Sequence, residues 1–254
     1  MAQDSMVAGQ KFEIGRVLST AVAVFFRNIG PFTVITAIIG IPYILISLWS
    51  VSSVGDLQAA AQTGSLPPGF FGMIAVGMVI LLLTNTLSQS AINYGTFQDL
   101  AGQKAAFADC LGRGLAMLPR VIGAALLASL GIAIGGLLFI IPGIILALMW
   151  WVFVPAIVVE GVGIMESFSR SRALTSGHRW GIFGLLIVVA IAQWLVAMVV
   201  GVVGAILGTI AAEILNLVVM LGFTAFTGVL CAVGYYYLRA EKEGIAIGDI
   251  ARFD

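Results

Sequence analysis

The chain has 254 residues, of which 61% are hydrophobic and only 9% are charged. A typical soluble domain carries about a quarter charged residues, so this composition excludes an ordinary soluble fold. The formal net charge of zero argues against a nucleic-acid surface. We therefore expect an all-α integral membrane protein with a single membrane domain over residues 1–254.

Five stretches contain no charged residue, and each is longer than the roughly 20 residues that a helix needs to cross a hydrocarbon core. A cluster of loop-forming residues at 62–68 divides the second stretch from the first. It separates a predicted helix over about residues 30–54 from one over about 70–98. The uncharged stretches are 28–55, 57–98, 121–159, 180–212 and 214–238.

The uncharged stretch 121–159 is too long for one ordinary span and long enough for two short ones. Proline is tolerated in the first turn of a helix and breaks its interior, so we expect a tight turn just before Pro142. Further spans are predicted from Trp180 to about Gly208 and over about 216–238. The sequence thus predicts six transmembrane helices.

The Lys and Arg residues support this count and suggest an orientation. Their twelve positions fall into four groups of three, placed before span one, between spans two and three, between spans four and five, and after span six. Six spans place all four groups on one face, and basic residues accumulate on the cytoplasmic face. We expect a multi-pass protein of the bacterial inner membrane with both termini in the cytoplasm.

Three of the basic segments have the spacing of amphipathic helices, and each precedes an odd-numbered span. These interfacial helices are predicted at 11–27, 107–120 and 164–177. They either set the topology only or also bind anionic lipid headgroups, to which each Lys or Arg contributes about 1 kcal/mol. Together with the hairpins that follow, they suggest a threefold repeat over 11–99, 103–160 and 163–240.

Polar side chains form a stripe inside the membrane. Asn85, Gln89 and Asn93 recur every four residues in span two, and Gln193 lies near the middle of span five. They form either a polar path or binding pocket, or hydrogen bonds that fix helix packing. Because no ionisable residue lies near the centre of any span, the sequence offers no carrier for ion coupling.

A cytoplasmic charge cluster is expected around the end of span four. Glu160 lies where the helix dipole disfavours an anion, so it needs a cationic partner, for which Arg172 and Arg179 are the nearest candidates. Glu166 and Arg170 have the spacing of an intrahelical ion pair. The candidate cluster comprises Arg113, Arg120, Glu160, Glu166, Arg170, Arg172 and Arg179.

Other residues suggest structure rather than chemistry. Cys110 and Cys231 are interpreted as apolar fillers, and His178 lacks further ligands at metal-binding spacing, so no metal or cofactor is expected. The tyrosines at 235–237 are typical of interfacial anchors. Small-xxx-small patterns at 131–135 and 204–208 allow close helix packing, within one bundle or between two copies.

The region 141–180 resembles a known family. It contains IPGII at 141–145, PAIVVEG at 155–161, ESFSRS at 166–171 and LTSGHRW at 174–180. This order is similar to that of the YciC-like bacterial membrane proteins, related to the membrane domain of some glycerophosphodiester phosphodiesterases. The resemblance implies an all-helical membrane module. It implies no phosphodiesterase activity, because the sequence provides no soluble catalytic domain.

We therefore expect a non-enzymatic inner-membrane protein that organises lipids or stabilises a membrane complex. Its expected partners are anionic headgroups and, in addition, a membrane protein or a second copy of the chain. The alternative is a transporter or permease subunit that moves a small or amphipathic molecule past Asn85, Gln89, Asn93 and Gln193. An intramembrane enzyme acting on phospholipid is a third hypothesis. The sequence contains no phosphate loop, nucleophile elbow or zinc-protease motif to support it.

Overall fold

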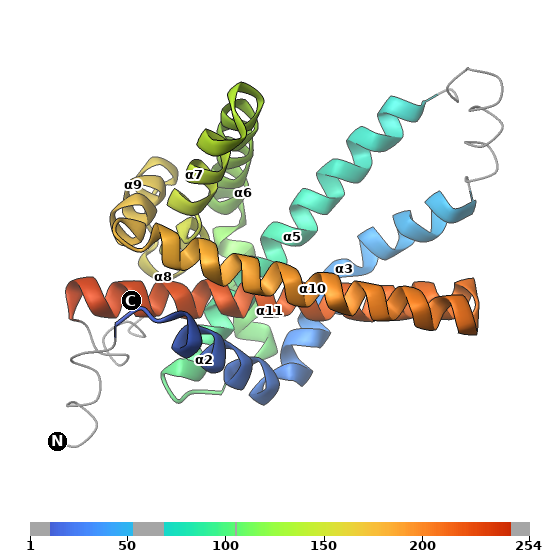
Figure 1. Cartoon of the computed structure of the whole chain (residues 1–254), viewed down its shortest axis with the longest axis horizontal. Helices are drawn as coiled ribbons and strands as arrows, with labels where there is room; N and C mark the ends of the chain where they lie inside the picture. Colours follow the sequence, from blue (N-terminus) through green and yellow to red (C-terminus); the bar gives the residue numbers. More distant parts are fainter. Residues whose placement is uncertain (1–10, 53–68, 105, 245–254) are drawn as a thin grey trace.

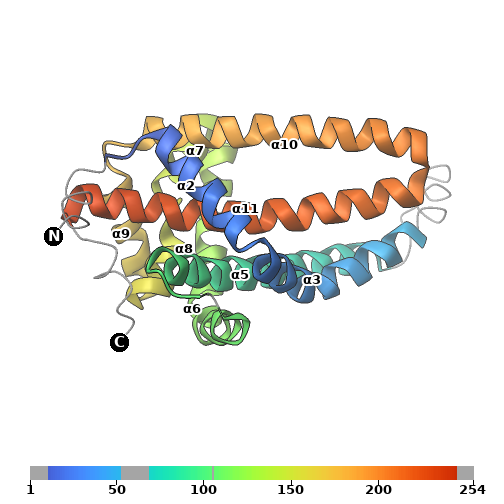
Figure 2. The ribbon, with the colours of Figure 1, turned by 90° about the horizontal axis from the view of Figure 1, so that it is seen from below.

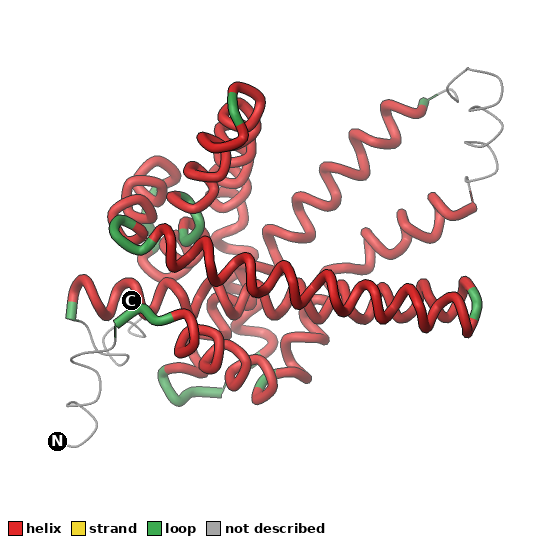
Figure 3. Tube along the Cα trace, viewed as in Figure 1, coloured by secondary structure: helices red, strands yellow, loops and turns green. Residues whose placement is uncertain are grey.

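The computed structural model describes residues 11–52, 69–104 and 106–244, and these are almost entirely helical (Figures 1 and 3). Six helical stretches are long and apolar enough to cross a membrane, which confirms the predicted fold class. The helices are α2 (Ile14–Arg27), α3 (Ile29–Ser52), α5 (Phe70–Leu100), α6 (Phe107–Leu138), α7 (Ile140–Met149), α8 (Phe153–Glu160), α9 (Ile164–Thr175), α10 (Arg179–Leu207) and α11 (Thr209–Glu243).

The spans pair into three hairpins that diverge from one end of the molecule (Figures 1 and 2). They are α3 with α5, α6 with α7 and α8, and α10 with α11. We call the end where α2, α9 and the last turns of α11 lie the base, and the opposite ends of the hairpins the tips. In each of the last two hairpins a single residue joins the two arms at the tip. It is Phe139 between α6 and α7, and Gly208 between α10 and α11.

The hairpin of α6 and α7 confirms the predicted turn before Pro142. The chain reverses at Phe139, and Pro142 lies in the first turn of α7, where its missing N–H costs nothing. The two arms touch at glycines: a Cβ on Gly143 would lie 2.8 Å from the Cα of Gly136. A larger residue at position 143 would therefore force the arms apart, whereas a Cβ on Gly136 meets no atom within 4 Å.

Helix α11 is the centre of the fold and packs against α2, α3, α5, α8, α9 and α10. Its last turns are therefore covered from several sides. Tyr235, Tyr236 and Tyr237 are 0%, 2% and 6% exposed. The prediction that they anchor the protein at the membrane interface is wrong, because neighbouring helices bury them in the protein.

Helix α2 confirms the amphipathic pattern, but protein rather than lipid covers its apolar stripe. Val17, Ala21 and Val24 are buried in the main core, and Thr20 bonds to Tyr237 of α11 with 2.9 Å between their hydroxyl oxygens. The pattern at 107–120 does not form a separate interfacial helix. It continues without a break into span three as α6, with Pro119 accommodated inside the helix. The threefold repeat stays a prediction.

Small residues allow close contacts within the chain. A Cβ on Gly131 would lie 2.7 Å from Cζ3 of Trp150, and Gly204 faces Ala212 across the hairpin of α10 and α11. The small-xxx-small patterns therefore serve packing inside this bundle. Cys110 and Cys231 are buried, free thiols, as expected of apolar fillers.

Candidate functional site

The C-terminal end of α8 is the centre of a charged cluster at the base. Arg170 of α9 donates to both carboxylate oxygens of Glu160, with nitrogen–oxygen distances of 2.8–2.9 Å. Tyr235 donates to the same carboxylate, and Nη1 of Arg239 lies 3.5 Å from it. Glu243 pairs with Arg170 and, at 2.7 Å, with Arg239. The cluster joins α8, α9 and α11.

Two more arginines reach the same helix end from α6. Arg113 donates to the carbonyl oxygen of Val158 at 3.2 Å, and Arg120 to that of Gly161 at 2.8 Å. The last carbonyl groups of a helix have no partner inside it, and they carry the negative end of its dipole. Cations from α6 thus stabilise the end of α8 that Glu160 makes more negative.

Burial and ion pairing shift the pKa of Arg170 in opposite directions. Burial would lower the pKa of its guanidinium, but the hydrogen bonds that Arg170 donates to Glu243 and Glu160, together with the negative charges of these two carboxylates, outweigh this, so the pKa lies above its ordinary value. Its side chain is 26% exposed, and that of Glu160 is 16% exposed. A paired arginine in this setting stays charged and holds its position, which suits a structural latch.

The structure corrects several predicted contacts of the charge cluster. Glu160 pairs with Arg170 and Arg239, not with Arg172 or Arg179. Residues 170 and 172 point about 200° apart on a helix, so only one of them faces α8. The expected pair between Glu166 and Arg170 is not formed. Glu166 instead accepts the N–H of Gly163 at 3.5 Å, at the start of α9.

Sequence reasoning missed the contribution of α11. Tyr235, Arg239 and Glu243 recur every four residues and therefore lie on one face of the helix. That spacing was a usable signal. The same residues also lie at and after the end of a span, a position equally typical of interfacial tyrosine anchors and of charges that set topology.

Further contacts tie the base together. Arg27 at the end of α2 bonds to Asp99 at the end of α5, and this hydrogen bond raises the pKa of Arg27. Glu241 of α11 accepts the N–H of Phe12 at 2.6 Å and lies 3.1 Å from Nε2 of His178. In addition, Lys242 donates to the carbonyl oxygen of Ala173. Segments far apart in the sequence thus form one surface.

The predicted intramembrane path is divided by α11. Gln89 donates to the carbonyl oxygen of Thr224 at 3.5 Å and to the hydroxyl of Thr227 at 3.4 Å, and the amide of Asn93 donates to the carbonyl oxygen of Gln89 at 2.7 Å. Asn85 lines a cavity of about 320 Å³ beside Gln89 and Trp151.

Gln193 lies on the other side of α11. It lines a separate cavity of about 250 Å³ together with Asn216, Thr224 and Thr227. Thr227 is common to both cavities and accepts the hydrogen bond from Gln89. The structure therefore brings Asn85 and Gln89 to one cavity, buries Asn93 one turn further along α5, and leaves Gln193 in a different cavity.

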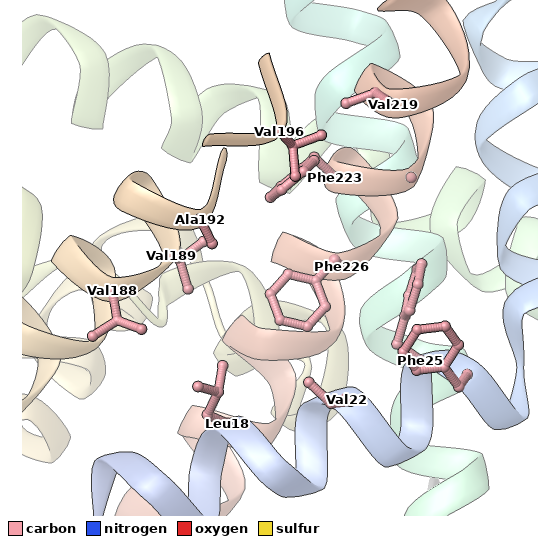
Figure 4. Close-up of a pocket in the computed structure, with 12 residues that line it drawn as sticks. Leu18, Val22, Phe25, Val188, Val189, Ala192, Val196, Val219, Phe223 and Phe226 are labelled. Carbon is pink, nitrogen blue, oxygen red and sulfur yellow. The ribbon is translucent and has the colours of Figure 1, made fainter. Parts of the chain in front are cut away.

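Two apolar hollows complete the candidate sites. One, of about 460 Å³, lies between α2, α10 and α11 and is lined by Phe25, Val189 and Phe226 among others (Figure 4). The second, of about 540 Å³, lies between α7 and α10 and contains Ile141, Ile145 and Phe183, with Arg179 and Trp180 at its margin. Trp180 is 84% exposed. No described residue bonds to the buried Nε atom of Arg179.

Among the described residues, no group of three or more His, Cys, Asp and Glu side chains could hold a metal ion. Comparisons with protein-family models, curated proteins and solved structures gave no match. The base and the intramembrane cavities are therefore the features of this chain that point to a function.

Proposed function

We propose that the protein is a non-enzymatic, multi-pass protein of the bacterial inner membrane that organises anionic phospholipids at its base. The described part of the base holds eleven Lys and Arg residues against seven Asp and Glu residues, an excess of four positive charges. Basic groups near a bilayer surface attract anionic headgroups with about 1 kcal/mol each. With both termini in the cytoplasm, the base faces the cytoplasm.

The observation that carries the proposal is the state of Arg172 and Arg179. Glu160, Asp99, Glu241 and Glu243 are all paired, yet neither arginine has an ion pair with any described residue. Arg179 lies beside the apolar groove of α7 and α10. A guanidinium next to such a groove matches a phosphate with an acyl chain attached.

The residues that resemble the YciC-like proteins support an architectural role for that pattern. Glu160 is the centre of the charged cluster, and Thr175 bonds to the carbonyl oxygen of Met149 at 3.2 Å. Gly177 has a φ of +86°, which favours glycine, at the turn into α10. We propose membership of that group on this basis: the shared pattern builds the junction of α8, α9 and α10.

The test is lipid retention by the purified, full-length protein. Native mass spectrometry in neutral detergent is expected to find phosphatidylglycerol retained at least tenfold over phosphatidylcholine. The double variant R172Q/R179Q is expected to reduce this preference by about fivefold or more. E213Q, at the tip of the α10 and α11 hairpin, is the matched control and keeps the preference. Equal retention of both lipids by the wild type would contradict the proposal.

One observation favours the transporter reading as a second candidate. The cavities on the two sides of α11 both reach Thr227, which accepts the hydrogen bond from Gln89. Gln89 and Thr227 therefore form the polar contact between the two cavities. Uptake by proteoliposomes of small polar solutes, lost in Q89L but not in A173C, would favour transport. Absence of any uptake would contradict a transport function.

A further inference from the structure

Two amide side chains on the apolar helices α10 and α11 have no hydrogen-bond partner among the described residues. Gln193 is the middle residue of the 29-residue helix α10, and Asn216 lies two turns into α11. Both are exposed and line the same cavity. Neither forms a hydrogen bond with any residue in the described ranges, whereas Thr224 of that cavity donates to the carbonyl oxygen of Met220 at 2.9 Å. An unpaired amide in hydrocarbon is costly, so both require a partner from outside.

An apolar cavity adjoins the amides. Val219 and Phe223 of α11 line both the polar cavity and the larger one of about 460 Å³ (Figure 4). Sites for small molecules typically measure about 300–1,000 Å³ and combine an apolar lining with a few polar groups. The two cavities together have that character.

The cavity is held open by the packing around it. At the tip, Gly204 and Ala212 bring α10 and α11 into contact. At the base, α2 packs against both helices, with the rings of Phe25 and Phe226 edge to face at 5.7 Å. Leu18 and Val22 of α2 form one wall of the hollow. Helix α2 therefore packs between α10 and α11 and separates these two helices in the middle of their hairpin.

We infer that this space binds an uncharged long-chain lipid, with a hydroxyl or ester group at Gln193 and Asn216 and its chain in the apolar cavity beside α2. No charged residue lines either cavity, which disfavours an ionic headgroup. The residues differ from those of the proposed phospholipid surface, so the two ideas fail independently.

Photolabelling of the full-length protein in detergent tests the inference, with a diacylglycerol that carries a diazirine in one acyl chain as the probe. Mass spectrometry is expected to find labels on α2, α10 and α11 around Phe25 and Phe223. Unlabelled diacylglycerol should compete, whereas hexadecane should not. The variant Q193L/N216L is expected to lose at least fivefold of the labelling. The matched amide control N85L, on the other side of α11, should label like the wild type.

A second variant keeps the inference testable if the double variant misfolds. A Cβ on Gly222 meets no atom within 4 Å, so G222L is expected to fold and to fill the apolar cavity. It should lose labelling while both amides remain. Equal labelling of all variants would overturn the inference, as would equal competition by hexadecane. A fall in oligomeric mass on Q193L/N216L would also overturn it, because a second copy would then be the partner of the amides.

Discussion

Arg170 donates hydrogen bonds to Glu160 from two nitrogens. Its Nε atom lies 2.9 Å from each carboxylate oxygen, and its Nη2 atom lies 2.8 Å from one of them. The two residues are ten positions apart, at the end of α8 and in the middle of α9. The contact fixes the reversal of the chain between these helices. It also places Arg170 beside Glu243, so that α11 is locked to the same point.

Loss of Arg170 should therefore destabilise the whole base. In R170A, Glu160 and Glu243 remain close together without their shared cation, and breaking a buried pair costs about 3–5 kcal/mol. Because the arginine is 26% exposed, we expect about 2 kcal/mol, seen as a lower midpoint of thermal unfolding in detergent. R172A is the matched control on the same helix and should unfold like the wild type. Equal midpoints for the two variants would show that the latch contributes nothing.

The polar residues of α5 should separate into a packing residue and an exposed one. Q89L removes hydrogen bonds to Thr224 and Thr227, and interhelical bonds of this kind contribute about 0.6–2 kcal/mol. We expect a corresponding loss in stability. N85L replaces an exposed amide that bonds to no described residue, so it should be neutral or stabilising. Guanidine or urea titration in mixed micelles measures both. A larger loss for N85L would reverse the assignment.

Gly234 should tolerate no side chain. A Cβ there would lie 2.6 Å from Cζ3 of Trp151, and this ring belongs to the junction between α7 and α8. Overpacking of this kind costs about 1–3 kcal/mol, so G234A should lower the unfolding midpoint. G222A on the same helix is the control, because an added Cβ at Gly222 meets open space. Adding W151L to G234A should recover stability; failure to do so would exclude the ring as the cause.

Patterns of hydrophobicity and helix breaking were sufficient to predict the spans. The uncharged stretches predicted six spans, and Pro142 with its glycine neighbours predicted the turn at the tip of α6. These features are local, because span length and proline geometry act within one helix or turn. The fold class follows from them directly.

The partners of individual charges could not be predicted in the same way. Glu160 has several arginines nearby in the sequence, and the packing of α9 against α8 decides that Arg170 rather than Arg172 faces it. Arg239 and Glu243 come from about 80 residues further along the chain. Amphipathic spacing likewise revealed the apolar stripe of α2 but not that α11 would cover it. Tertiary packing decides each of these cases.

The membrane orientation can be tested by cysteine accessibility in a C110A/C231A background, which removes the two native thiols from the labelling. Ala173 and Lys104 are exposed at the base, whereas Glu213 is exposed near the tip of the α10 and α11 hairpin. If the hairpins cross the bilayer, a charged, impermeant maleimide should label E213C in intact cells and should label A173C and K104C only after the cells are opened. This result follows from basic segments remaining in the cytoplasm. Labelling of A173C and E213C from the same side would contradict a membrane-spanning α10, and inverted labelling would reverse the orientation that we propose.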